Sequence, residues 1–124
     1  MRLLLDAHAF LWWVTNSSRI SDAAKRAIGD PANDVAIGIG CLWELAIKRS
    51  LRKLDFPFDF EPVLQDEGFE LVPISHEHLR TLENLPLHHR DPFDRLLIAQ
   101  SIAERLAIVT NDEAFSRYAV SVIW

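Results

Sequence analysis

Apolar residues along the chain follow two alternating patterns. Short runs rich in valine, isoleucine and leucine have the length of buried strands, and longer segments between them repeat apolar residues at helical spacing. The predicted strands are Arg2–Leu5, Val35–Ile39, Glu70–Ile74, Ala107–Thr110 and Val120–Ile123. The predicted helices are Ala7–Thr15, Ser21–Ile28, Leu42–Leu51, Phe60–Glu67, His76–Asn84, a helix after Asp91, and Asn111–Tyr118.

Residues at the ends of these segments agree with the helical pattern. Ser21 is a favourable N-cap, and Gly29 follows the end of the same helix. Asp91 precedes Pro92, which suits the first position of a helix. Strands that alternate with helices form βαβ units, so we expect a mainly parallel sheet with helices on both faces.

The composition is that of a folded, water-soluble protein. The 124 residues suffice for one domain, 1–124, and 49% of them are apolar, which is enough for one core. No apolar run reaches the ~18–20 residues that span a bilayer, and Asp6 interrupts the only N-terminal run, so we expect no signal peptide and no membrane segment. Cys41 has no partner for an internal disulfide. We therefore expect a cytoplasmic protein.

The net charge of −5 by itself disfavours a nucleic-acid partner, because both molecules would be negative. Four of the acidic residues have a special placement, however. Asp6 directly follows the first predicted strand, and Asp112 follows the fourth. Glu44 lies early in the helix after the second strand, and Asp94 lies in the first turn of the helix after Asp91. In a parallel sheet these positions converge on the crevice at the carboxyl ends of the strands.

Carboxylates gathered in this way repel one another, and some of them would have to take up protons. A hard divalent cation relieves that repulsion, and Mg²⁺ or Mn²⁺ prefers oxygen ligands. A cation so held polarises a phosphate oxygen and activates water. No cysteine and histidine spacing suits zinc. The four carboxylates therefore predict a metal-dependent hydrolysis of phosphodiesters.

Each acid also has a purely structural interpretation. Asp6 would cap the helix that follows it, and Asp94 would favour the dipole of its own helix. Glu44 lies four residues before Lys48, which would give a surface ion pair worth ~0.3–0.5 kcal/mol. The shared edge, rather than any single residue, indicates a site.

Asp112 and Asp91 differ in this respect. Thr110 and Glu113 have the spacing of a capping box, which would leave Asp112 without a structural task. Asp91 has a full structural explanation as an N-cap before Pro92, so we treat it as a supporting residue.

The chain resembles the PIN-domain family, and within it the VapC-like toxins of type II toxin–antitoxin pairs. The resemblance covers almost the whole chain and depends on four segments. They are LLLDAHAFLW from Leu3, LWELAIK from Leu42, LPLHHRDPFDRLLIAQ from Leu85, and VTND from Val109 with Phe115 and Tyr118.

This resemblance implies an α/β fold, a three-layer α/β/α sandwich with a mainly parallel sheet of four to five strands. It implies a Mg²⁺- or Mn²⁺-dependent endoribonuclease whose acids are Asp6, Glu44, Asp94 and Asp112. Asp6 and Asp94 would be the first metal ligands, and Thr110 would hold a ligand carboxylate or water. It also implies a homodimer and a cognate antitoxin protein whose tail enters the groove.

Three positions depart from the pattern of the family. Ala7 stands where a threonine usually follows the first aspartate, and Gly38 and Cys41 stand where serines often precede the glutamate. Hydroxyl groups that would support the metal ligands are therefore missing. Losses of this kind cost ~10–100-fold in affinity or activity.

Histidines and basic residues near the four acids are candidates for further roles. His8 lies two residues after Asp6, where it would support the site or pack beneath it. Two basic clusters have either a solvated, structural interpretation or a role in contacting RNA phosphates. They are His88, His89, Arg90 and Arg95 beside Asp94, and Lys48, Arg49, Arg52 and Lys53 at a helix end.

The first predicted helix carries Phe10, Leu11, Trp12 and Trp13, which cannot all face inward at a period of 3.6 residues. We expect about half of them to form an exposed apolar patch, of the kind that marks a homodimer or antitoxin interface.

Three functions remain open. The first is a metal-dependent ribonuclease toxin. The second is a non-catalytic PIN-like binding module that acts only through a protein partner, which the departures at Ala7, Gly38 and Cys41 favour. The third is a phosphatase-like hydrolase, which would normally carry a second acid two residues after its nucleophilic aspartate. His8 occupies that position after Asp6.

Overall fold

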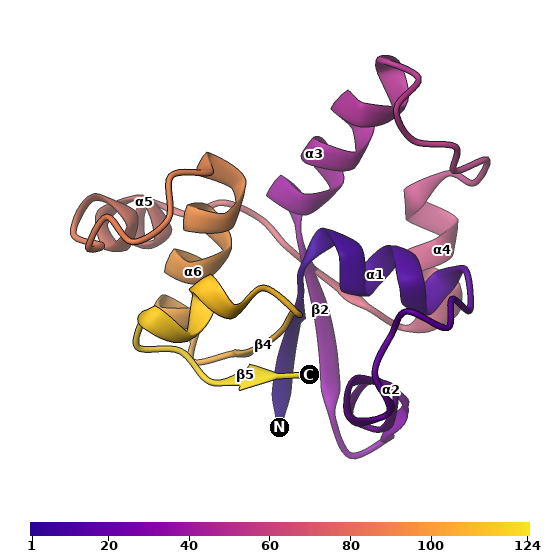
Figure 1. The fold of residues 1–124 in the computed structure, drawn as a ribbon, viewed down its shortest axis with the longest axis horizontal. Coiled ribbons are helices and arrows are strands. Elements are labelled where there is room, and N and C mark those ends of the chain that lie inside the picture. The colour runs from indigo at the N-terminus through magenta and orange to yellow at the C-terminus, as the bar shows by residue number, and fades with distance from the viewer.

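A parallel sheet of five strands forms the centre of the computed structural model, which describes residues 1–124 (Figure 1). Its strand order is β3-β2-β1-β4-β5, and every neighbouring pair is parallel. The central strand is the most buried, because Leu3, Leu4 and Leu5 have no exposed surface. The strands are β1 (Arg2–Leu5), β2 (Asp34–Gly38), β3 (Glu70–Val72), β4 (Ala107–Val109) and β5 (Val122–Ile123).

Helices cover both faces of this sheet. Right-handed crossovers place the helices between β1 and β3 on one side, and the reversal after β3 sends the next helices to the other side. Figure 1 shows α1, α2 and α4 on one side and α5 and α6 on the other, with α3 extending beyond the carboxyl end of β2. The predicted α/β/α sandwich with a parallel sheet is confirmed. The helices are α1 (Ala7–Val14), α2 (Asp22–Gly29), α3 (Ile39–Ser50), α4 (Phe60–Glu67), α5 (His76–Glu83) and α6 (Pro92–Glu104), with the 3₁₀ helix η1 (Glu113–Arg117).

The direction of winding reverses beside the central strand. The chain passes from β1 through β2 to β3 on one side, and then returns to place β4 against the other side of β1. Functional groups in sheets of this kind collect at the carboxyl ends of the strands, where the order reverses. The ends of β1 and β4 therefore frame the candidate site.

Helix α3 begins at Ile39, earlier than the predicted Leu42. The sequence did not predict this start, because β-branched Ile39 favours a strand and Gly40 disfavours a helix. The glycine is favoured by packing, since a Cβ atom at Gly40 would lie 2.8 Å from Cδ2 of Leu96 on α6 and this buried side chain would have to move. Close contact between α3 and α6 thus decides the local structure.

The expected apolar patch on α1 is wrong. Phe10 is buried in the core, and Trp12 and Trp13 are half-buried against it. The Trp13 indole donates a hydrogen bond to Glu67 Oε2 at 2.8 Å, and Trp12 packs against Trp124. Residues from α4 and from the end of the chain therefore cover this helix, which its own sequence could not show.

An exposed apolar stripe lies on α3 instead. Trp43, Ile47 and Leu51 follow one another at a spacing of four residues, and their exposed fractions are 58%, 37% and 59%. Trp43 also contacts the ring of Phe93 edge-on. No helix of the structure is long and apolar enough to cross a bilayer.

We predict that Gly40→Val destabilises the protein by about 1–3 kcal/mol, because the added carbons would overpack the contact with buried Leu96. Gly29→Val is the control, since a Cβ atom there would lie at an ordinary 3.5 Å from Trp13. Urea unfolding measures both variants. Equal stabilities of the two variants would contradict the packing constraint.

Candidate metal centre

Asp6 lies at the end of β1 and at the start of α1, where it makes two hydrogen bonds. Its Oδ1 accepts the Ala9 N–H at 2.7 Å, as expected of an N-cap, and its Oδ2 accepts the Thr110 hydroxyl at 2.5 Å. Both side chains are buried. Burial raises the pKa of Asp6, and the Thr110 and Ala9 hydrogen bonds offset part of this effect.

Asp112 is joined to Asp6 through the same hydroxyl. The Asp112 N–H donates to Thr110 Oγ1 at 3.1 Å, and Asp112 Oδ1 caps η1 by accepting the Ala114 N–H at 2.9 Å. The predicted capping box of Thr110 and Glu113 is therefore wrong. Because the helix starts later than expected, Asp112 is the cap, and Thr110 is free to link two acids.

Asp94 is placed by the N-terminus of α6. As predicted, Asp91 caps this helix, and its Oδ1 accepts the N–H groups of Phe93 and Asp94. The pKa of Asp94 is raised to about 7, first by burial and then by the negative charges of Asp91, Glu44 and Asp112. Asp94 thus carries the strongest sign of crowded negative charge.

Glu44 approaches the same edge from α3. Its Oε2 forms an ion pair with Lys48 Nζ at 3.1 Å, as its spacing predicted. Its charge contributes to the raised pKa values of Asp94 and Cys41, so it lies close to the other acids. The structure thus brings the four predicted carboxylates to one edge, where Lys48 partly neutralises one of them.

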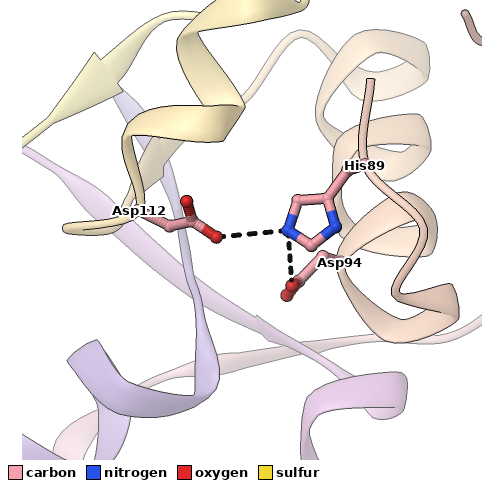
Figure 2. Close-up of side chains that lie close together, drawn as sticks. All are labelled: His89, Asp94 and Asp112. Carbon is pink, nitrogen blue, oxygen red and sulfur yellow. Dashed lines mark hydrogen bonds and ion pairs between the residues drawn. The ribbon is translucent and has the colours of Figure 1, made fainter. Parts of the chain in front are cut away.

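His89 lies between two of these acids, which its sequence position did not reveal. Its Nε2 is 3.0 Å from Asp94 Oδ2 and 3.2 Å from Asp112 Oδ2 (Figure 2). The sequence placed His89 only in a basic cluster near Asp94. Its contact with Asp112 joins residues 23 positions apart, and no local pattern indicates such a pair.

The three departures from the family pattern lie beneath or beside these acids. The Cys41 thiol donates to the Leu5 carbonyl at 3.7 Å, and burial together with the charge of Asp6 raises its pKa well above the ordinary value. Cys41 is therefore a neutral thiol. At Gly38 a Cβ atom would lie 2.7 Å from Gln100 Oε1, so a serine there would require Gln100 to move. Ala7 is buried.

Two arginines from the basic clusters use their guanidinium groups in contacts within the protein. The Arg49 guanidinium donates to the carbonyls of Phe56 and Phe58 and lies over the Phe60 ring. The Arg95 guanidinium donates to the carbonyls of Pro86 and His89, and to that of Leu82. Both residues hold loops in place, a task that the sequence did not indicate.

The remaining candidates are more accessible. Arg90, His88 and His8 are exposed, and Lys48 is half-buried beside Glu44. The His8 ring stacks on Trp12 at 5.4 Å, and the His88 ring lies edge-on to Tyr118. Arg90 is thus the exposed arginine nearest in sequence to His89 and Asp94.

The donor set fits a hard divalent cation. Asp94 and Asp112 each offer a carboxylate oxygen, and these oxygens form with Nε2 of His89 a three-residue cluster whose atoms lie within 4.8 Å of one another. Carboxylate oxygens are the preferred ligands of Mg²⁺ and Mn²⁺. Burial and then neighbouring acids raise the pKa of Asp94 to about 7, so the protein does not fully compensate the negative charge at that residue. Asp6 and Glu44 flank the three-residue cluster and could complete the coordination.

Comparison with known proteins gives a consistent assignment. The family model described as PIN domain matches residues 3–121. Ribonuclease VapC22 of Mycobacterium tuberculosis (strain ATCC 25618 / H37Rv) is 31% identical over 113 residues, which are 89% of this chain and 86% of the relative.

Solved structures share the fold at lower identity. VapBC2 from Rickettsia felis, bound to a DNA fragment from its promoter, has a TM-score of 0.67 at 17% identity, covering 98% of this chain and 97% of the other. A toxin–antitoxin complex from Klebsiella pneumoniae has a TM-score of 0.65 at 16% identity, covering 98% and 96%. The family match, the VapC relative and the shared fold agree, and the chain belongs to the PIN-domain family as a VapC-like member.

Proposed function

We propose that the chain is a Mg²⁺- or Mn²⁺-dependent endoribonuclease and the toxin of a toxin–antitoxin pair. The observation that carries this proposal is the gathering of Asp6, Glu44, Asp94 and Asp112 at the edge where the strand order reverses. The ribonuclease name of its VapC relative supports an RNA substrate. Because such a substrate and a free thiol at Cys41 suit the cytoplasm, we place the protein there.

The roles of the side chains follow from their positions. Asp94 and Asp112 would hold the cation, and Asp6 and Glu44 would complete its surroundings directly or through water. When bound, the cation would polarise a phosphate oxygen and supply an activated water. Thr110 fixes the positions of Asp6 and Asp112 relative to each other, since its one hydroxyl donates to Asp6 and accepts the Asp112 N–H.

Helix N-termini add a second attraction for the phosphate. Asp6 caps α1 and Asp94 lies in the first turn of α6, whereas Glu44 lies further along α3, which begins at Ile39. The dipoles of these helices favour negative charge at this edge, while the N–H groups of Ala9, Phe93 and Asp94 are already bonded to Asp6 and Asp91. Arg90 and His88 in the loop before α6, and Lys48 on α3, are the proposed contacts to neighbouring RNA phosphates, with His8 as a supporting residue beside Asp6.

The exposed stripe of Trp43, Ile47 and Leu51 is the proposed antitoxin surface. Such a stripe is unusual on a free helix, and the structural relatives include toxin–antitoxin complexes. We also propose a homodimer, following the family resemblance.

The first prediction concerns cleavage. RNA is cut in the presence of Mn²⁺ or Mg²⁺, and EDTA or Asp94→Asn reduces the rate by at least about 100-fold, because a ligand to the cation is lost. Asp59→Asn is the matched control, since Asp59 is an exposed N-cap of α4 without a side-chain cap bond. Gel analysis with mapped ends measures the products. Equal cleavage by Asp94→Asn would refute the proposed site, and a wild type that pairs with a partner but never cuts would favour the binding module.

The second prediction concerns Thr110. Thr110→Val keeps the shape of the residue but removes the hydroxyl that links Asp6 and Asp112, so we expect a loss of about 10–100-fold in cleavage rate at fixed Mn²⁺. Thr110→Ser retains the hydroxyl and should remain nearer to wild type. Cleavage rates of the two variants at matched stability decide the matter. A Val variant as active as the Ser variant would show that the link is dispensable.

The third prediction concerns stability. The pKa of Asp94 is about 7 in the folded chain and ordinary (3.8) in the unfolded chain, so the folded chain binds the carboxyl proton more tightly. Protonation of Asp94 therefore stabilises the folded state, and this stabilisation is lost as pH rises from about 4 through 7. At pH 8, without metal, Asp94→Asn should raise the free energy of unfolding by about 1–2 kcal/mol, a value reduced for partial exposure. At pH 4 the gain should be small.

Urea unfolding in EDTA at the two pH values provides the measurement. Asp59→Asn again serves as the control, and it should change little at either pH. A loss of stability in Asp94→Asn at pH 8 would mean that the carboxylate is already well compensated.

A further inference from the structure

The imidazole of His89 occupies the space between the two carboxylates that would hold the cation. One nitrogen, Nε2, approaches Oδ2 of Asp94 at 3.0 Å and Oδ2 of Asp112 at 3.2 Å (Figure 2). The contact with Asp112 is a hydrogen bond and the contact with Asp94 is a close polar contact, so two carboxylate oxygens face the same nitrogen. His89 therefore interacts with both carboxylates at once.

A neighbouring backbone group fixes which nitrogen carries the hydrogen. The Asp91 N–H donates to Nδ1 of His89 at 3.2 Å, so Nδ1 presents its lone pair. The hydrogen of the imidazole must then lie on Nε2. His89 thus donates its Nε2–H to Asp112 Oδ2 and holds the same nitrogen 3.0 Å from Asp94 Oδ2, and in this form Nε2 has no lone pair to offer a metal.

The backbone that carries this ring is held in place. The N–H groups of His89 and His88 both donate to the Tyr118 hydroxyl, at 2.8 and 3.0 Å. The ring also lies edge-on to Phe115, at 5.8 Å between centroids. Phe115 belongs to η1, the helix that Asp112 caps, and Tyr118 follows its last residue. The segment that carries the imidazole and the segment that carries Asp112 are therefore anchored to each other.

We propose that His89 is a placeholder for the cation: its Nε2–H bridges Asp94 and Asp112 in the metal-free protein and has to withdraw when a divalent cation binds them. This inference rests on the proposed metal-dependent function. Mg²⁺ binds oxygen at ~2.0–2.1 Å, so a cation held by both oxygens on the side that His89 covers would contact Nε2. An N–H group in that contact repels a cation, and the two cannot share the space.

The placeholder has a clear physical purpose. It keeps two acids of like charge together without metal, so the site is assembled before the cation arrives. It also weakens cation binding, since the hydrogen bond from Nε2–H to Asp112 and the close contact with Asp94 are lost in exchange. The affinity for metal is therefore set partly by a residue that does not ligate it.

Titration of the purified, EDTA-treated protein with Mn²⁺ in a calorimeter tests this inference. His89→Ala should bind Mn²⁺ about tenfold more tightly than wild type, because no hydrogen bonds to charged groups are given up. His76→Ala, an exposed histidine on α5, is the matched control and should bind as wild type does. Equal or weaker binding by His89→Ala overturns the placeholder, since a ligand or a simple support would weaken binding when removed.

A second measurement needs no variant. Long-range ¹H–¹⁵N NMR of the imidazoles should show the Nε2–H form of His89 in metal-free protein, and Mg²⁺ should shift its Nε2 resonance away from the value of the bridged state. An Nδ1–H form without metal, or an Nε2 resonance unchanged at saturating Mg²⁺, overturns the proposal.

The outcomes also separate this inference from the proposed function. If wild type binds Mn²⁺ and cuts RNA while His89→Ala binds no more tightly, the placeholder fails and the nuclease stands. If His89→Ala binds more tightly but no variant cuts RNA, the placeholder stands and the nuclease fails.

Discussion

Repulsion between carboxylates at the carboxyl edge of the sheet is the constraint on which the rest of the structure depends. Asp6 and Asp94 have raised pKa values because burial and like charges act together. Each nearby contact offsets part of this cost, through the hydroxyl of Thr110, the Nε2–H of His89 and the ammonium of Lys48. A site that still carries uncompensated charge after these contacts is well suited to a divalent cation.

Burial of apolar residues at the centre of the fold offsets the free-energy cost of gathering carboxylates at its edge. The leucines of β1 are fully buried between two helical layers, and Asp6 directly follows the last residue of this strand. The same strand thus supplies apolar burial along its length and a metal-type ligand at its end. Close packing of α3 on α6, which favours Gly40, brings Glu44 toward Asp94. Stability in the core and strain at the edge are therefore two consequences of one arrangement.

Much of this could be predicted from the sequence, because it depends on local patterns. Alternating strands and helices predicted the parallel sheet, and the rule about strand ends predicted that the four acids would converge. What failed depends on contacts between distant segments. Trp12 is covered by Trp124, and His89 meets Asp112 across a loop and a helix. Thr110 bonds to Asp6, 104 positions away, in place of the predicted capping box. Periodicity and capping rules contain no information about such pairs.

The acidic net charge acquires a different meaning in this arrangement. Arg49 and Arg95, which the sequence offered as phosphate contacts, direct their guanidinium groups to backbone carbonyls and so hold loops in place. Of the basic residues that the sequence offered near the site, these two are then not available to contact RNA. In the proposed nuclease, the attraction must come largely from the bound cation and from the N-termini of α1, α3 and α6. Without a bound cation the carboxylates repel RNA, and with a bound cation they contribute to RNA binding. Binding of metal and binding of RNA are therefore thermodynamically coupled, and a residue that controls the first also controls the second.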